Sequence, residues 1–112
     1  MRTQAVMFDI DDTLIDVETG KTIPYSLNLL HRCKEAGLHI VIITARPGYD
    51  SNIQWTEEQL LEHGISYDEL WFCPMEYKNS LKHKLGYEFL LSVGDRLEDL
   101  GLSKKNLLIL KN

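Results

Sequence analysis

The sequence predicts an α/β fold in which one parallel five-stranded sheet is covered by helices on both faces, a three-layer Rossmann-like arrangement. Short apolar runs alternate along the chain with segments of helical periodicity, which is the pattern of a parallel sheet with right-handed crossovers. A glycine follows each of the three helical segments, at positions 37, 64 and 86, where a helix commonly ends. Ligands of such sheets bind beyond the carboxyl ends of the strands, so the residues that follow each strand bear most directly on function.

The five predicted strands are short and apolar. The second of them is rich in β-branched residues, which predicts a strand buried on both faces of the sheet. The strands are predicted to cover residues 4–8, 38–44, 70–73, 89–93 and 107–110.

Three helices are predicted between these strands. The first begins at Pro24, a residue that suits the first turn of a helix, and it carries apolar side chains at every third position. The second covers about residues 52–63, and a capping-box spacing allows a start as late as Thr56. The third runs from about residue 76 to residue 85. Residues 100–106 leave no room for a full helix before the last strand.

The composition is that of one globular domain spanning residues 1–112. Hydrophobic residues make up 44% and charged residues 26% of the chain, and the net charge is −5. This acidic balance argues against broad electrostatic binding to nucleic acid, and no apolar run approaches the roughly 20 residues that span a bilayer. Because the first residues do not resemble a signal peptide, we expect a cytoplasmic protein whose Cys33 and Cys73 stay reduced.

Chemically active side chains follow four of the five predicted strands. Clustered carboxylates repel one another unless a cation lies among them, and their hard oxygen atoms favour Mg²⁺. A carboxylate held there can attack phosphorus, a second can move protons, and a lysine and a hydroxyl can orient the phosphoryl oxygens. The residues concerned are Asp9, Asp11, Thr44, Arg46, Lys78, Asp95 and Asp99.

Four segments of the chain resemble the sequence motifs of the haloacid dehalogenase superfamily of phosphohydrolases. The stretch FDIDDTL is similar to the first motif, IITARP to the second, Lys78 to the third and VGDRLED to the fourth. The stretch YKNSLKHKLGYEFLLSVGDRLEDL further resembles the class B-type acid phosphatases, and ITARPGYDSNIQWTEEQLLEHGI resembles both that branch and the phosphatase half of phage polynucleotide kinases. This likeness favours Lys78 over Lys82 or Lys84 as the catalytic lysine.

The resemblance implies a role for each residue of the motifs. Asp9 would attack phosphorus as the nucleophile, and Asp11 would serve as general acid and base. Thr44 would bind a phosphoryl oxygen, and Lys78 would balance the charge of Asp9 and of the phosphate. Arg46 would reach either the phosphate or only the solvent.

The resemblance also implies a Mg²⁺ site and an order of strands. The carboxylates of Asp9 and Asp95 and the backbone carbonyl of Asp11 would bind the ion. Asp99 would either bind the ion through water or support Lys78. The strand order would be 5-4-1-2-3, as in the core of the superfamily.

The chain has no spare length for a cap domain over this site. Residues 14–43 number 30 and residues 45–77 number 33, and each interval must supply a helix and a strand. Residues 14–23 can form at most a small flap with Gly20 at its tip. We therefore expect a capless site, which accommodates large phosphorylated substrates such as phosphoproteins or nucleic-acid ends. A partner chain that acts as the cap is an alternative.

The expected function is Mg²⁺-dependent hydrolysis of phosphomonoesters through an aspartyl-phosphate intermediate. A polynucleotide end-phosphatase would use the same active site, although the net acidity disfavours it. A phospho-receiver domain needs an aspartate after the third strand, where this chain has Pro74. A non-catalytic domain that only binds partners is the remaining alternative, but every expected catalytic group is present.

Several polar and aromatic residues outside the motifs are expected to be structural. We expect three neighbouring residues to form a solvated helix face: Lys82, His83 and Lys84. Trp55, Trp71 and Phe72 are predicted to lie in the core, with contact between Trp55 and the substrate as the alternative for that residue.

Overall fold

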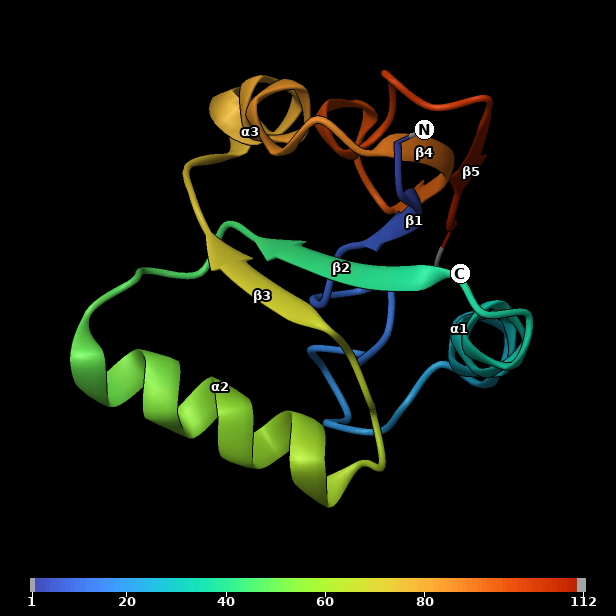
Figure 1. The fold of residues 1–112 in the computed structure, drawn as a ribbon. Coiled ribbons are helices and arrows are strands. Elements are labelled where there is room, and N and C mark those ends of the chain that lie inside the picture. Colours follow the sequence, from blue (N-terminus) through green and yellow to red (C-terminus); the bar gives the residue numbers. More distant parts are fainter. Residues whose placement is uncertain (1, 111–112) are drawn as a thin grey trace.

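The computed structural model describes residues 2–110 and contains one sheet of five parallel strands (Figure 1). The strand order is β3-β2-β1-β4-β5, which confirms the predicted order when it is read from the opposite edge. The strands are β1 (Gln4–Phe8), β2 (His39–Thr44), β3 (Glu69–Phe72), β4 (Glu88–Gly94) and β5 (Lys105–Leu108).

Helices cover both faces of the sheet, so the predicted three-layer arrangement is confirmed. In Figure 1, α1 and α2 lie on one side of the sheet and α3 lies on the other. The helices are α1 (Pro24–Glu35), α2 (Asp50–Glu62) and α3 (Lys78–Leu85). Two 3₁₀ turns lie beside them, η1 (Met75–Tyr77) before α3 and η2 (Leu97–Asp99) after β4.

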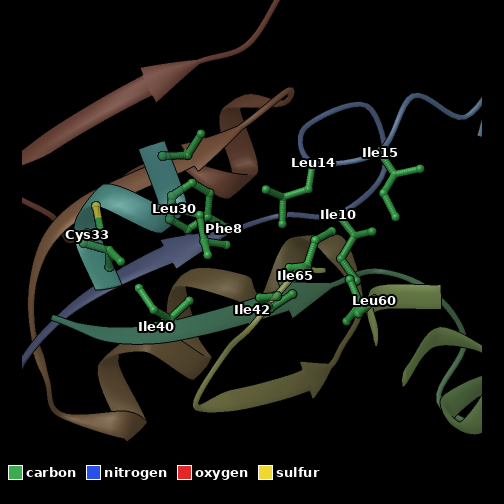
Figure 2. Close-up of a cluster of buried hydrophobic side chains, with 12 residues drawn as sticks. Phe8, Ile10, Leu14, Ile15, Leu30, Cys33, Ile40, Ile42, Leu60 and Ile65 are labelled. Carbon is green, nitrogen blue, oxygen red and sulfur yellow. The ribbon is translucent and has the colours of Figure 1, made fainter. Parts of the chain in front are cut away.

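The side chains of β1 alternate between two apolar layers, because successive residues of a strand point to opposite faces. Phe8 belongs to the larger layer, shown in Figure 2, where it is buried together with Leu30 of α1 and Leu60 of α2. Met7 belongs to the smaller layer on the other face, against which Leu81 of α3 packs. The central strand is therefore buried on both sides, and the residue that follows it is held by a rigid scaffold.

Several predicted boundaries differ from the structure, and three of these differences have a physical cause. Helix α2 begins at Asp50, so the alternative start at Thr56 is wrong; the Thr56 hydroxyl accepts a hydrogen bond from Arg46 instead of capping the helix. The third helix begins with the η1 turn, and α3 itself starts only at Lys78. Strand β5 starts at Lys105, because this part of the chain pairs with β4 from Leu91 onward.

The loop after β1 forms the small flap that the sequence predicts. Ile15 pairs with Asp11 and with Thr22 in two isolated bridges, and its 2% exposed side chain anchors the flap to the core. Gly20 has a φ of +72°, a conformation that glycine adopts without strain. Between β2 and β3 the chain forms only α2, so neither interval holds an inserted cap within residues 2–110.

Both cysteines are unpaired, as predicted, and burial raises the pKa of each thiol above its usual value. Over the described part of the chain, no helix combines the length and the apolar character needed to cross a bilayer.

The carboxylate of Glu69 ties the edge strand β3 to β2 and to Tyr87, the residue before β4. It accepts hydrogen bonds from the hydroxyl of Tyr87, from Nε2 of His39 at 2.5 Å and from Nε1 of Trp71 at 2.9 Å. Partial burial alone would raise the pKa of Glu69, but these hydrogen bonds lower it below the usual value overall. A carboxyl group with a lowered pKa in the folded state stabilises the fold above its ordinary pKa, and this contribution is lost as the pH falls through the folded pKa.

Replacing Glu69 with glutamine is expected to lower the free energy of unfolding at pH 7 by about 1 kcal/mol, a figure reduced for the partial exposure of the group. The difference from the wild type should shrink as the pH falls below 4.5, the ordinary pKa of the group. Urea denaturation between pH 7 and about pH 3.5 measures it. The matched control is Glu62→Gln, because Glu62 is an exposed carboxylate on α2. A pH-independent effect of Glu69→Gln would contradict this account.

Candidate active site

The end of β1 places Asp9 at the point where the sheet changes its direction of winding. The chain builds β1, β2 and β3 outward in one direction and then returns to β4 on the other side of β1. In doubly wound sheets this switch point is where ligands bind. The backbone N–H of Asp9 donates to the carbonyl of Val93 at 3.0 Å, so the β1–β4 ladder continues to the aspartate itself. Asp9 is 4% exposed.

A single ammonium group joins two buried carboxylates in this site. Nζ of Lys78 lies 2.9 Å from Oδ1 of Asp9 and 2.6 Å from Oδ1 of Asp99, and the Lys78 and Asp99 side chains are fully buried. Gly94 permits this packing, because a Cβ at that position would lie 2.2 Å from Cβ of Asp99. The glycine of the VGD stretch is therefore required by the close approach of Asp99 to the end of β4.

The charge balance of this cluster shifts the pKa values of its members. Burial, aided by the neighbouring Asp99, raises the pKa of Asp9 to about 7, although Lys78 acts in the opposite direction. Burial would lower the pKa of Lys78, but the two carboxylates raise it above its usual value overall. Lys78 is therefore charged at neutral pH, and a further cation would favour the ionised form of Asp9.

The carboxylates of this site suit a divalent cation. One oxygen atom from each of Asp9, Asp95 and Asp99 lies within 4.8 Å of the other two, and Lys78 pairs with only two of these carboxylates, Asp9 and Asp99. Hard oxygen donors in excess of positive charge are the environment that Mg²⁺ prefers. Both oxygens of Asp99 already accept hydrogen bonds, from Lys78 and from the backbone N–H of Arg96 at 3.2 Å. Asp9 and Asp95 line the open cleft and are the more accessible donors.

Arg46 binds Asp11 in a bidentate ion pair. Nη2 of Arg46 lies 2.7 Å from Oδ1 of Asp11, and Nε lies 3.0 Å from Oδ2. Nη1 donates to Oγ1 of Thr56 at 3.1 Å, and the guanidinium carbon lies 5.0 Å from the centre of the Trp55 ring. The Arg46 side chain is only 9% exposed, so the alternative that it reaches only solvent is wrong. The planar guanidinium presents two parallel N–H donors, which match the two oxygens of a carboxylate and would match two oxygens of a phosphate equally well.

Two threonine hydroxyls are buried next to these groups. Oγ1 of Thr44, at the end of β2, accepts a hydrogen bond from the backbone N–H of Arg46 at 3.2 Å. Oγ1 of Thr13 donates to Oδ2 of Asp9 at 3.2 Å, so it orients the oxygen that Lys78 does not hold. Thr13 was not among the predicted site residues, although its place in the FDIDDTL stretch was the signal that could have identified it.

These groups surround an open cleft of about 500 Å³. Thr44, Lys78 and Asp99 are fully buried and are not part of its lining. The cleft is lined by Asp9, Asp11, Asp12, Val17, Ala45, Arg46, Pro47, Asn52, Trp55, Met75, Asp95 and Arg96.

The predicted core positions of two tryptophans are wrong. Trp55 is 53% exposed, because α2 turns it away from the sheet and toward Arg46 at the cleft. Trp71 is 40% exposed on the edge strand β3, which has a neighbouring strand on one side only. Phe72 is partly buried. The exposed face of Trp55 is thus available to a molecule in the cleft.

Lys82 was predicted to be solvated, and the structure contradicts this. Its side chain is 1% exposed, whereas His83 and Lys84 are exposed as predicted. Burial lowers the pKa of Lys82 to about 8, against a raising effect of Asp99, so it is mainly an ammonium at neutral pH. The signal in the sequence was the spacing from Lys78, because residues four positions apart share a face of a helix.

Comparison with known proteins agrees with this architecture. The doubly wound parallel sheet belongs to the class of Rossmann-like α/β folds. Residues 6–67, more than half of the sequence, match the family of haloacid dehalogenase-like hydrolases, and the chain belongs to that family. No curated protein matches the sequence significantly.

Two of the solved structures that resemble this chain illustrate the comparison, and the first of them shares the fold. One chain of a Pnkp1/Rnl/Hen1 complex matches with a TM-score of 0.71 and 21% sequence identity, over 88% of this chain and 41% of that one. A hypothetical protein from Pyrococcus horikoshii OT3 matches with a TM-score of 0.48 and 19% identity, over 82% of this chain and 34% of that one. This chain thus spans less than half the length of either solved chain.

Proposed function

We propose that this chain is a Mg²⁺-dependent phosphomonoesterase that acts through an aspartyl-phosphate on Asp9. The observation that carries the proposal is the pairing of Lys78 with both Asp9 and Asp99, with Asp95 beside them at the edge of the sheet. A carboxylate that is held by a lysine and opens to a cleft is suited to nucleophilic attack on phosphorus. The membership of the hydrolase family supports the same reaction type.

In the first half-reaction, a carboxylate oxygen of Asp9 attacks the phosphorus of the ester. The bond between phosphorus and the leaving oxygen breaks, and that oxygen takes the electron pair and a proton from Asp11. Lys78 and Thr13 hold the Asp9 carboxylate in place during the attack. The hydroxyl of Thr44 would bind a phosphoryl oxygen as the charge on it rises, which requires the substrate to reach below the present lining of the cleft.

In the second half-reaction, water hydrolyses the aspartyl-phosphate. Asp11, now ionised, takes a proton from the water as its oxygen attacks phosphorus. The bond between phosphorus and Asp9 breaks, which releases inorganic phosphate and regenerates the carboxylate. The same residue thus acts first as general acid and then as general base.

The Mg²⁺ ion would be held by the carboxylates of Asp9 and Asp95 and by the backbone carbonyl of Asp11. A bound ion would offset the charge of the carboxylates and of the phosphoryl group. Asp99 would support Lys78 and contact the ion at most through water, because both its oxygens already accept hydrogen bonds.

Arg46 would exchange its partner when substrate binds. Its guanidinium is held by Asp11, yet Asp11 has to carry and transfer a proton during catalysis. A phosphate dianion offers the same bidentate geometry with a higher charge. Transfer of Arg46 to the phosphate would release Asp11 for acid–base chemistry at the moment the substrate arrives.

Replacing Arg46 with alanine is therefore expected to raise KM for a phosphate ester by about tenfold or more, since a charge-assisted bidentate contact is lost. Arg46→Lys keeps the positive charge but not the paired donors of the guanidinium, so its KM should lie between those of the wild type and of Arg46→Ala. Steady-state kinetics measure both, with Arg32→Ala on the exposed face of α1 as the matched control. An Arg46→Ala variant with wild-type KM and kcat would overturn this role.

An open cleft without an inserted cap suits large phosphorylated substrates, including macromolecules in the cytoplasm. A release assay over a broad set of phosphate monoesters tests the proposed activity, with Mg²⁺ and with a chelator. We expect phosphate release that requires Mg²⁺ and is lost with the chelator. The proposed activity is wrong if no ester is hydrolysed.

A polynucleotide end-phosphatase is the second candidate, because the exposed face of Trp55 at the cleft would allow a nucleobase to stack. A parallel assay with p-nitrophenyl phosphate, a phosphopeptide and a 3′-phosphorylated oligonucleotide distinguishes the two. A higher kcat/KM on the oligonucleotide that falls in Trp55→Ala would favour this candidate. Equal or lower kcat/KM on the oligonucleotide would exclude it.

A further inference from the structure

Lys82 of α3 uses all three of its N–H donors inside the protein. Its Nζ donates to Oγ of Ser92 at 2.9 Å, to the backbone oxygen of Asp99 at 2.8 Å and to the backbone oxygen of Gly101 at 2.9 Å. An ammonium has three donors, so the group is fully satisfied although it is buried. A charge is rarely buried unless its partners are placed for it.

The carbonyls that Lys82 binds belong to the connection between β4 and β5, which contains no α-helix. The η2 turn ends at Asp99, and the chain then reaches β5 at residue 105. Nδ2 of Asn79, also on α3, donates to the carbonyl of Leu100 at 3.1 Å. Three consecutive carbonyls, from Asp99 to Gly101, are therefore held by side chains of α3. These bonds replace the support that a packed helix would give this connection.

The backbone that Lys82 holds is connected to Asp9 through two further side chains. The backbone that Lys82 holds carries the carboxylate of Asp99, which binds Lys78 at 2.6 Å, and Lys78 binds Asp9 at 2.9 Å. Asp99 packs so tightly against Gly94 that no side chain would fit between them. A shift of this connection therefore moves Asp99 relative to Lys78 and alters the position of Lys78 against Asp9.

We propose that Lys82 is a positioning residue for phosphoryl transfer, which rests on the function proposed for Asp9. Lys82 does not line the cleft, and it acts through the backbone of Asp99 and the side chain of Lys78. A neutral residue at position 82 leaves the buried carbonyl of Asp99 without its donor and removes one donor from Gly101 and from Ser92, which keep their contacts with Ser103. The connection then relaxes and Asp99 moves. A misplacement of about 1 Å in such a site costs up to about 100-fold in rate.

The kinetic test compares Lys82→Met, Lys82→Ala and the matched control Lys84→Ala, which removes an exposed lysine of the same helix. We expect both Lys82 variants to lose kcat by about tenfold or more, with KM changed by less than about threefold. Propylammonium, which replaces the atoms that Lys82→Ala lacks, should restore kcat of that variant. It should not restore Lys82→Met, whose side chain fills the space, and 1-propanol should restore neither.

Wild-type kcat in folded Lys82→Met would overturn the proposal. Rescue of Lys82→Ala by 1-propanol as strong as that by propylammonium would also overturn it, because the side chain would then only need to fill space. If neither Lys82 variant folds, Ser92→Ala serves as the test, since it removes one acceptor and no charge. Its kcat should fall by about two- to fivefold, because Lys82 loses one acceptor and Ser92 also loses its contact with Ser103. An unchanged kcat in Ser92→Ala would then count against the role of Lys82.

Hydrogen exchange separates this proposal from the proposed function. The backbone amides of residues 99–101 should exchange about tenfold faster or more in Lys82→Met than in the wild type or in Lys84→Ala. This readout needs no substrate. A wild type that hydrolyses no ester would refute the function alone, whereas unchanged exchange at residues 99–101 would refute the support by Lys82.

Discussion

Replacing Asp9 with asparagine is expected to abolish Mg²⁺-dependent turnover, with a loss of about four orders of magnitude or more, as for other nucleophiles. The variant should remain folded. Asparagine has the same shape as aspartate, and its neutral side chain leaves one carboxylate, Asp99, paired with Lys78 in the buried part of the site. In metal-free buffer, the variant should be at least as stable as the wild type, because fewer carboxylates then share one ammonium.

Thermal denaturation with and without Mg²⁺ accompanies the activity measurement. Mg²⁺ should raise the Tm of the wild type more than that of Asp9→Asn, since a ligand that binds only the folded state stabilises it by mass action. Asp50→Asn on the exposed first turn of α2 is the matched control and should keep both activity and the Mg²⁺ response. Substantial turnover by purified Asp9→Asn would contradict the role of this residue.

Replacing Lys78 with methionine is expected to have the largest effect on stability. It removes the ammonium that Asp9 and Asp99 share, and Asp99 is fully buried. Loss of one partner from a buried ion pair costs about 3–5 kcal/mol, because the remaining charge keeps its desolvation penalty without compensation. Chemical denaturation in metal-free buffer should show this loss, and turnover should be abolished as well.

Two further variants make this prediction specific. Lys84→Met on the same helix removes an exposed lysine, and its stability should stay within about 0.5 kcal/mol of the wild type. Adding Asp99→Asn to Lys78→Met removes the unpaired charge and should restore part of the lost stability, a coupling that a double-mutant cycle measures. If Lys78→Met were as stable as Lys84→Met, the ion-pair cluster would not support the fold as described.

The architecture and the positions of the motif residues were predictable from the sequence. In a parallel sheet the carboxyl ends of all strands lie at one edge. The position of each strand therefore brings Asp9, Thr44 and Asp95 together without knowledge of any side-chain contact. Lys78 follows from the same logic, because α3 begins directly after the segment that leaves β3.

The partners of the side chains were not predictable in the same way. Helical spacing places Lys82 on the face of Lys78, but it does not reveal that the β4–β5 connection offers carbonyls at that point. The pairing of Arg46 with Asp11 joins loops that follow different strands, so only the folded arrangement defines it. Trp55 is large and apolar and favours burial by composition, yet packing over Arg46 leaves it half exposed.

Acid-quench labelling tests the central claim most directly. The protein is mixed with a ³²P-labelled phosphate monoester and Mg²⁺, quenched in acid within a fraction of the turnover time, and digested for peptide mapping. We predict a label that is released by hydroxylamine, as an acyl-phosphate is, and that resides on the peptide carrying Asp9. Turnover of the ester with no protein-bound label, or with the label on a peptide without Asp9, would contradict the account.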